Sequence, residues 1–327
     1  MKSPFTGKEM KKVYEKRTWE FRGEKYEYVH TSWLCADTGE RFTTDETDNT
    51  AYVQVTNQYR EKYGIPFTDE IIGLRERYGL SAAKMAQILG FGINQWRHYE
   101  SGEVPSVSNG RMIRSIMTPS VFLDYVESSR NVLGLKEFEK IRSGVSLLAE
   151  QDSGRVEYDL TRVYRCARGS GNGYAPLSLD RLKNLLLYVL NQCGEVFYTK
   201  MNKLLFYADF VAYRNLGMSI SGLSYKAIEF GPVPDRWDRV YSQFDDIIQE
   251  PRAYGDKEGS VLMSNVVADQ TVFTEAEIEV LNEVCALFCN STSADMTRIS
   301  HEECAWLDNV DGHRAIPFES AFQLKAI

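Results

Sequence analysis

TDEIIGLRERYGLSAAKMAQILGFGINQWRHYESGEVPSVSNGRMIR, residues Thr68–Arg114, is the stretch that decides how the first half of this chain folds. Thr68 is typical of a helix N-cap, and the apolar residues after it recur with the spacing of one helical face. Ser81 predicts the cap of a second helix, which a glycine-rich turn follows. A third helix is expected over residues 93–101, ended by Gly102. The stretch therefore predicts three short helices joined by tight turns.

The predicted third helix has an apolar face and a polar face. Asn and Gln pair well with adenine, and Arg pairs with guanine or with a phosphate oxygen. The polar face is therefore predicted to enter the major groove of DNA. The alternative is a three-helix packing module that binds no nucleic acid. The candidate DNA-binding residues are Asn94, Gln95, Arg97, His98, Lys84 and Ser106.

The run YESGEVPS at residues 99–106 closes the third helix. It resembles the Xre-type helix-turn-helix family, in which an aromatic residue, Glu, a small residue and Gly end the recognition helix. The resemblance implies a five-helix bundle that extends past Pro119. It also implies binding to operator DNA as a homodimer, with half-sites about one helical turn apart.

Length and composition limit the number of domains and the class of protein. The chain has 327 residues, which suggests two or three domains, and its 43% hydrophobic content is ordinary for globular folds. It holds no apolar run long enough to span a membrane, and its first residues lack the apolar core of a secretory signal. A cytoplasmic location without membrane contact is therefore expected. The six cysteines are then expected to be reduced thiols and not a disulfide framework.

Charge is distributed unevenly along the chain. Residues 178–327 carry 13 Lys and Arg against 22 Asp and Glu, a net charge of −9, whereas the remaining residues carry 25 against 24. DNA would be repelled by the acidic second half, so DNA binding is expected in the first half. The second half is better suited to a basic protein partner.

Residues 1–48 are rich in strand-forming aromatic residues, and Arg-Gly-Glu at 22–24 is typical of a hairpin turn. Two turns, SPFTG at 3–7 and CADTGE at 35–40, have the outline of a Cys-x-x-Cys-Gly zinc knuckle. They resemble the N-terminal zinc ribbon of MqsA-type (YgiT-type) antitoxins, which precedes an Xre-like domain. Tetrahedral zinc needs about four Cys or His ligands, but the four positions hold one cysteine. A ribbon without zinc or another cofactor is therefore predicted, with these residues at the ligand positions: Ser3, Thr6, Cys35 and Thr38.

The centre of the chain predicts helices and then a linker. Periodic apolar residues predict a helix over 45–63 and two more over 120–149, divided near Gly134. Polar residues followed by a Gly- and Ser-rich run indicate a flexible or extended linker. The predicted domains are a degenerate zinc-ribbon-like domain at 1–48, a helix-turn-helix domain with flanking helices at 49–150, a linker at 151–177 and a second large domain at 178–327.

The second large domain begins at Ser178, a predicted helix cap. Four of its motifs occur in an order that resembles the SocA-like Panacea domain, over roughly residues 178–320. Members of that family are antitoxins, so the resemblance implies direct binding and neutralisation of a toxin encoded alongside. The motifs are KLLFYAD at 203–209, EFGPVP at 229–234, TEAE at 274–277 and SHEECAW at 300–306.

The resemblance places the toxin contact around the domain's central strand and turn, residues 225–237. The sequence GPVP predicts a rigid, sharp turn there, and aromatic and acidic residues surround it. The alternative is that the aromatic residues belong to the core. The candidate toxin-binding residues are Tyr225, Glu229, Phe230, Asp235, Trp237 and Asp238.

This domain also contains a set of polar residues that could form a catalytic site and a set of Cys and His residues that could bind a metal. The polar set shows no nucleophile–base spacing. Its members are therefore interpreted as helix caps and ion pairs, and no enzyme is predicted. The Cys and His set has the residue types of a zinc site at helical spacings. Cysteine is often only a buried packing residue, however, so no metal is predicted. The sets are Lys203, Tyr207, Asp209, Glu229, Asp235, His301 and Glu303, and Cys285, Cys289, His301 and Cys304.

Together these patterns predict an α+β, mostly helical chain: a small β-rich ribbon, a helix-turn-helix bundle, and a mainly helical domain with a small sheet. The predicted function is that of a type II antitoxin, which binds its cognate toxin through the C-terminal domain and represses its own operon. One alternative is a transcriptional regulator that responds to a ligand or a phage protein without a toxin partner. Another is a hydrolase with an accessory DNA-binding domain.

Overall fold

The computed structural model describes residues 1–154, 168–254 and 257–327. In these ranges the fold is α+β and about half helical, with thirteen α-helices and small antiparallel sheets. The coarse fold class predicted from the sequence is therefore confirmed. The chain forms two compact units, one made of Met1–Val55 and Asp159–Ile327 and the other of Thr56–Tyr158.

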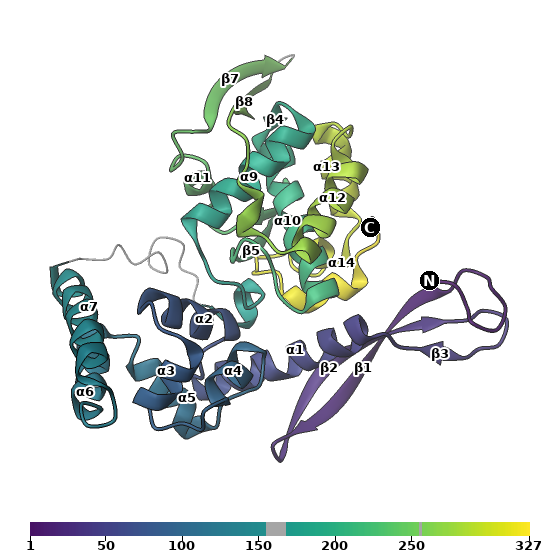
Figure 1. The fold of residues 1–327 in the computed structure, drawn as a ribbon. Coiled ribbons are helices and arrows are strands. Elements are labelled where there is room, and N and C mark those ends of the chain that lie inside the picture. The colour runs from purple at the N-terminus through teal and green to yellow at the C-terminus, as the bar shows by residue number, and fades with distance from the viewer. Residues whose placement is uncertain (155–167, 255–256) are drawn as a thin grey trace. The chain divides into compact units, whose positions relative to one another are not determined.

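The N-terminal residues form a long hairpin with a short third strand (Figure 1). β1 (Lys11–Phe21) pairs antiparallel with β2 (Glu24–Leu34), and β2 pairs with β3 (Arg41–Phe42). Arg22 and Gly23 join the first two strands, and both have positive φ. This geometry is that of a two-residue turn matched to the twist of a hairpin, so the hairpin turn predicted here is confirmed.

The helix α1 (Asp45–Tyr63) occupies the residues predicted for it. Its Arg60 is buried, and the guanidinium donates to the carbonyl oxygens of Pro66, Gly102 and Glu103 at 2.5, 3.3 and 3.3 Å. A buried charge is tolerated when its N–H groups are hydrogen bonded. Arg60 and these acceptors all lie in the unit Thr56–Tyr158, so Arg60 ties the C-terminal half of α1 to two loops of its own unit.

Six more helices follow in that unit: α2 (Thr68–Arg77), α3 (Ala82–Ile88), α4 (Gln95–Glu100), α5 (Val107–Ser115), α6 (Pro119–Ser128) and α7 (Leu135–Gly154). Phe67 occupies the N-cap position of α2, and its backbone N–H donates to the Glu70 carboxylate at 2.7 Å. Thr68 is therefore the first residue of the helix and not its cap. Ser81 caps α3 as predicted. The helix expected over 93–101 is shorter at both ends.

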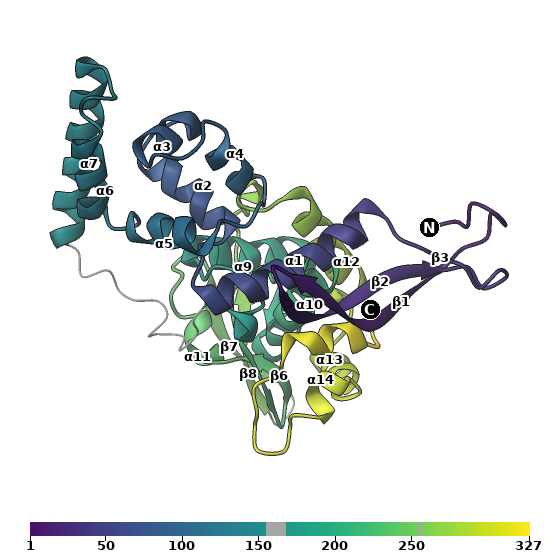
Figure 2. The same cartoon turned by 90° about the horizontal axis from the view of Figure 1, so that it is seen from below.

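A single apolar core joins α2 to α7. Trp96 has no exposed surface and belongs to the same buried cluster as Ile71, Met85 and Phe122. The helices α6 and α7 lie side by side as a helical hairpin (Figures 1 and 2), as the division near Gly134 predicted. These two helices therefore extend the core that supports α4.

The C-terminal part contains helices around two small sheets. One sheet has the strand order β4-β8-β7, and the other is the antiparallel pair β5-β6. Short 3-10 turns lie at Ser170–Asn172, Gln270–Val272 and Phe318–Gln323. The main elements are α9 (Leu179–Cys193), β4 (Val196–Phe197), α10 (Tyr198–Leu216), β5 (Tyr225–Ile228), β6 (Gly231–Pro234), α11 (Trp237–Val240), β7 (Ile248–Tyr254), β8 (Lys257–Met263), α12 (Glu275–Phe288), α13 (Ser293–His301) and α14 (Cys304–Leu307).

The helix α10 is the centre of this domain, because every residue from Lys200 to Arg214 is buried. It packs against α12, α13 and the strand β6. A helix that is buried on all sides must satisfy its polar side chains internally. Among the described residues, neither α10 nor any other helix is long and apolar enough to cross a bilayer.

Three local predictions need correction in the C-terminal part. Gly231–Pro234 is the strand β6 and not a turn, since it pairs with β5. The sequence Ser300-His301-Glu302-Glu303 has the pattern of a capping box and so predicts a helix start, but Ser300 lies in the last turn of α13, and the capping box of that helix is at Thr292. Residues 155–167 of the predicted linker lie outside the described part. The Gly-rich stretch after it is packed, because the buried Asn172 amide donates to the carbonyl oxygens of Ala175 and Gly222 at 2.9 and 3.0 Å.

Candidate functional site

Polar side chains gather at the start and along the outer side of α4. Asn94, at the N-cap position, and Arg97 and His98, within the helix, are exposed. Gln95 is half-buried, and its amide donates to a Glu103 carboxylate oxygen at 3.1 Å. The structure thus brings four of the six candidate DNA-binding residues to one short helix, and we call these four side chains the α4 surface.

The α4 surface rests on buried aromatic residues. Trp96 and Tyr99 face the core of the unit. The indole N–H of Trp96 donates to the Glu100 carboxylate at 2.8 Å, and Nε of Arg75 on α2 donates to the same oxygen at 2.5 Å. Asn109 donates to the Tyr99 hydroxyl at 2.8 Å. Because the polar atoms of this support are paired, α4 is held in one orientation.

The other two candidate DNA-binding residues have structural partners of their own. Lys84 on α3 forms an ion pair with Glu137 at 2.8 Å and donates to Gln87 at 2.8 Å. Ser106 caps α5, where its hydroxyl accepts a hydrogen bond from the Asn109 backbone at 3.1 Å. Both residues therefore stabilise helices, whatever else they contact.

A two-residue loop, Glu229-Phe230, connects β5 and β6, since Ile228 pairs with Gly231. We call this loop the tip. Both side chains are exposed, and 64% of the Phe230 surface is accessible, although phenylalanine is usually buried. Tyr225, at the start of β5, is fully buried. Phe230 is therefore not a core residue, whereas Tyr225 is one.

A buried lysine holds the backbone of the tip. Lys203 on α10 is fully buried, and its Nζ donates to the carbonyl oxygens of Phe230 at 2.5 Å and Thr199 at 3.2 Å. Burial lowers the pKa of Lys203 to about 8. Gly231 has a φ of +105°, and a Cβ there would lie 2.8 Å from Lys203 Cε and Ser300 Oγ. Glycine is thus required by both the backbone conformation and the closeness of the lysine.

A tryptophan holds the other side of the tip. The indole N–H of Trp306 donates to the Ile228 carbonyl at 2.7 Å, and the His301 ring stacks on the Trp306 ring with centroids 3.9 Å apart. Burial, followed by the nearby charge of Lys203, lowers the pKa of His301. The imidazole is therefore neutral at physiological pH and acts as an aromatic packing group.

The second exposed aromatic residue of the predicted site is Trp237, the first residue of α11. It is 38% exposed, and its ring packs edge-on against Tyr198 with centroids 6.4 Å apart. Tyr198 is the first residue of α10, and the carbonyl of the next residue is the second acceptor of Lys203. The N-terminal turn of α10 therefore positions both exposed aromatic residues.

The acidic candidates of this site differ in their contacts. Glu229 is exposed on the tip. Asp235 forms an ion pair with Lys226 across the β5–β6 pair, with Nζ and Oδ1 3.1 Å apart. The Asp238 side chain lies outside the described residues. Glu229 is thus the acidic candidate most directly presented beside Phe230.

Buried carboxylates of the C-terminal domain have structural partners. Asp209 accepts hydrogen bonds from the Ser221 backbone at 2.8 Å and from the Tyr225 hydroxyl at 2.6 Å, although burial raises its pKa. Glu303 accepts from the Tyr207 hydroxyl at 3.1 Å and from two backbone N–H groups near residue 325. These contacts fit the interpretation of the candidate polar set as groups that hold the fold.

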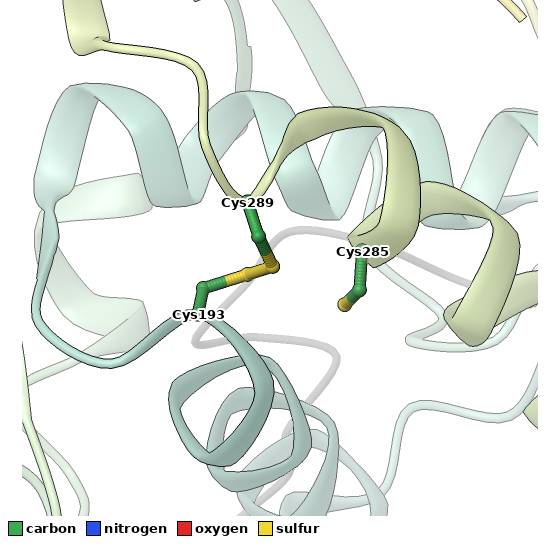
Figure 3. Close-up of side chains that lie close together, drawn as sticks. All are labelled: Cys193, Cys285 and Cys289. Carbon is green, nitrogen blue, oxygen red and sulfur yellow. A yellow bond between two sulfur atoms is a disulfide. The ribbon is translucent and has the colours of Figure 1, made fainter.

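Three cysteines gather where α9 and α12 end. Cys193 and Cys289 form a disulfide across 96 residues of sequence, and the Sγ of Cys285 completes a group whose sulfurs lie within 4.8 Å of one another (Figure 3). The prediction that the cysteines are reduced is wrong for this pair, because sequence spacing does not show that the two helix ends meet. In the described part of the chain, His301 and Cys304 do not join this group.

The four knuckle positions of the N-terminal domain come together with one sulfur among them. The Ser3 hydroxyl accepts from the backbone N–H groups of Phe5 and Thr6 at 3.3 and 3.4 Å. The Thr6 hydroxyl lies 3.8 Å from the Cys35 sulfur. Hydrogen bonds, first from Ser3 and then from Thr38, lower the pKa of Cys35 to about 6. That this group binds no zinc stays a prediction.

The residues that hold the tip were not predicted to do so. The sequence identifies Lys203 only as a candidate polar group and Trp306 only as part of a motif. One signal was available for Lys203, because a lysine inside the apolar run KLLFYAD must be paired if the helix is buried. The hydrogen bond from Trp306 joins residues 78 apart in sequence, and no local pattern reports it.

A family model described as "Antitoxin SocA-like, Panacea domain" matches residues 201–307. This segment runs from α10 to α14 and contains the tip, Lys203 and Trp306. No curated protein and no solved structure matches the chain. The SocA-like resemblance is therefore confirmed for this segment, whereas the MqsA-type and Xre-type resemblances stay predictions.

Proposed function

We propose that this protein is the antitoxin of a type II toxin–antitoxin pair and binds its cognate toxin directly through the tip. The observation that carries the proposal is Phe230, an exposed aromatic residue on a loop whose backbone is fixed from two sides. It lies within the segment that matches an antitoxin-type domain. That match also favours a protein-binding role over an enzymatic one.

The energetics of the tip suit binding to a protein. Burial of a phenylalanine side chain contributes about 1.5–3 kcal/mol, and aromatic residues are common among binding hot spots. A loop that is already held in one conformation loses little entropy when a partner binds. Lys203, Gly231 and Trp306 provide this preorganisation for Phe230.

Charge gives a further reason for a toxin partner that is basic. Residues 178–327 have a net charge of −9, and Glu229 is exposed beside Phe230. Complementary charge accelerates encounter and disfavours wrong partners. Asp235 already has Lys226 as its ion-pair partner, so Glu229 is expected to contribute more to recognition.

The helices α3 and α4 are proposed to act as an Xre-type helix-turn-helix that binds operator DNA as a homodimer. The support is the α4 surface, where Asn94, Arg97 and His98 are exposed while Trp96 faces the core. Binding at the operator of its own operon would repress transcription of the antitoxin and toxin genes. The N-terminal hairpin is proposed to be an MqsA-like ribbon without zinc.

Co-expression with the products of neighbouring genes tests the proposal. A neighbouring product that stops growth alone, and permits growth when the full-length protein is present, identifies the toxin. Co-purification of the two proteins should then be lost with Phe230→Ala and kept with the α4 variant Arg97→Ala. Failure of every neighbouring product to inhibit growth would overturn the toxin partner. Operator binding that changes with a small molecule or a phage protein would then favour the regulator alternative.

A further inference from the structure

The cysteine group at the ends of α9 and α12 belongs neither to the tip nor to the α4 surface. We propose that, once the Cys193–Cys289 disulfide is reduced, Cys193, Cys285 and Cys289 bind one Cu(I) ion as three thiolate ligands. The inference goes beyond the proposed function, because it assigns a metal site to a part of the domain that recognition of toxin and DNA does not use.

The backbone already places the three sulfurs at metal-binding separation. Cys285 and Cys289 are four residues apart on one face of α12, and Cys193 ends α9 with its Cα 4.8 Å from that of Cys289. All three Sγ atoms lie within 4.8 Å of one another (Figure 3). A metal–sulfur bond of about 2.3 Å places three thiolates around one ion about 4 Å apart. Small side-chain rotations are therefore enough to form the site.

The ligand set selects the metal. Thiolates are soft ligands that favour Cu(I) and Zn²⁺ over hard cations. Zinc sites in proteins are almost always four-coordinate, but within the residues that the structure describes, no fourth His, Cys, Asp or Glu joins this group. Cu(I) is stable with three sulfur ligands in a plane. The three-sulfur set therefore fits Cu(I) better than zinc.

Charge and exposure around the group are compatible with such a site. The buried Lys200 donates to the Cys289 carbonyl at 2.5 Å, so a positive charge lies beside the thiolates that a bound ion would require. Cys193 and Cys289 are only half-buried and give access from solvent.

Formation of the site begins with a reduction. A cellular dithiol transfers two electrons and two protons to the Cys193–Cys289 bond, which breaks to give two thiols while the dithiol becomes a disulfide. Cu(I) then replaces the protons of the three thiols, forming three copper–sulfur bonds and releasing three protons to solvent. The oxidised protein cannot form this site, because two of its three ligands are bonded to each other.

Competition for Cu(I) tests the proposal. The starting protein is the full chain with Cys35→Ser, Cys166→Ser and Cys304→Ser, which removes every cysteine outside the group. It is reduced with a phosphine, freed of reductant without oxygen, and titrated with Cu(I) against a coloured chelator. About one Cu(I) per chain is expected, with three sulfur neighbours by X-ray absorption. The same protein with its disulfide intact is expected to bind none.

Substitution of Cys285 decides whether three sulfurs take part. Cys285→Ser in that background should weaken Cu(I) binding at least tenfold, and Cys193→Ser, at a less buried position, should do the same if the first variant folds poorly. Circular dichroism checks the fold of each. Unchanged affinity in both variants, no Cu(I) binding by the reduced protein, or preferential retention of Zn²⁺ in a mixed titration would overturn the proposal.

Discussion

On the α4 surface, exposed polar side chains such as Arg97 belong to a helix that buried apolar residues support. At the tip, by contrast, the exposed side chain is apolar, Phe230, and buried polar groups hold its backbone. Trp96 and its buried neighbours hold α4 from behind. The tip is held by the ammonium of Lys203 and the indole N–H of Trp306, which donate to its backbone. The first arrangement is that of any amphipathic helix. The second leaves most of the Phe230 side chain in water.

The difference concerns where the stabilising free energy resides. The support of α4 combines apolar burial, which is distributed over many contacts, with the hydrogen bonds of Trp96 and Arg75 to Glu100. The tip depends on a few hydrogen bonds in a buried setting, and loss of one leaves an unpaired polar atom that costs about 1–3 kcal/mol. Substitutions behind the tip are therefore expected to have larger effects than substitutions on either surface.

The largest effect is expected for Gly231→Ala. The new Cβ would meet Lys203 and Ser300 at 2.8 Å and would also be strained at a φ of +105°. Overpacking and strain together should lower the free energy of unfolding by about 2–4 kcal/mol, measured by urea denaturation. Gly312→Ala is the matched control, because Gly312 has a φ of +83° but open space around it. Equal losses in the two variants would show that the closeness of Lys203 is unimportant.

The next effect is on binding and not on folding. Phe230→Ala should change the free energy of unfolding by less than about 0.5 kcal/mol, as surface substitutions usually do. It should weaken toxin binding by about 2 kcal/mol, or roughly thirtyfold, measured by calorimetry. Val267→Ala removes an apolar side chain that is 79% exposed elsewhere in the domain and should leave binding unchanged. A large loss of stability in Phe230→Ala would contradict the assignment of Phe230 to a binding surface.

A smaller effect is expected on the α4 surface. Asn94→Ala should relax sequence preference, and Arg97→Ala should weaken operator binding about tenfold and reduce the salt dependence by about one phosphate contact. Gel shifts at several salt concentrations measure both quantities. Lys136→Ala removes an exposed positive charge from α7 and serves as the control. If all three variants bind DNA equally, the DNA contact lies elsewhere; neutralisation of the toxin should persist in each.

Apart from these substitutions, a pH dependence is expected that originates behind the tip. Burial lowers the pKa of Lys203 from 10.5 to about 8, so above pH 8 the folded protein releases a proton that the unfolded chain keeps. Stability contributed by this group is therefore absent below pH 8 and rises toward pH 10, by at most about 1.4 kcal/mol per pH unit. Lys203→Met should lack this rise when urea denaturation is repeated across the range. The same slope in both proteins would assign it to other groups.

Local chemistry explains which parts of the fold could be predicted. The helix at 45–63 and the caps at Ser81 and Ser178 follow from the sequence, because each depends on residues that lie close together in the chain. Gly and Pro favour turns, so the sequence predicts a turn at Gly231–Pro234, but pairing with β5 determines its extended conformation.

The candidate sites divide in the same way. The exposed face of α4 follows from the spacing of Trp96 and Tyr99, which local sequence shows. The exposure of Phe230 does not follow from the local sequence, because an aromatic residue beside Gly and Pro is equally compatible with a core position. The tip is held in place by Lys203 and Trp306, which lie 27 and 76 residues from Phe230 in the sequence. Only the packing of α10 and α14 brings them to the tip.

The tip separates the residues that determine stability from those that determine specificity. Lys203, Gly231 and Trp306 fix the loop, while the side chains of Glu229 and Phe230 point into solvent. Substitutions at 229 and 230 can therefore accumulate without passing through unstable intermediates. Under the proposed function, these two positions can diversify against a changing toxin while the scaffold stays constant. A library randomised at these two codons would then be a practical source of variants with altered toxin range.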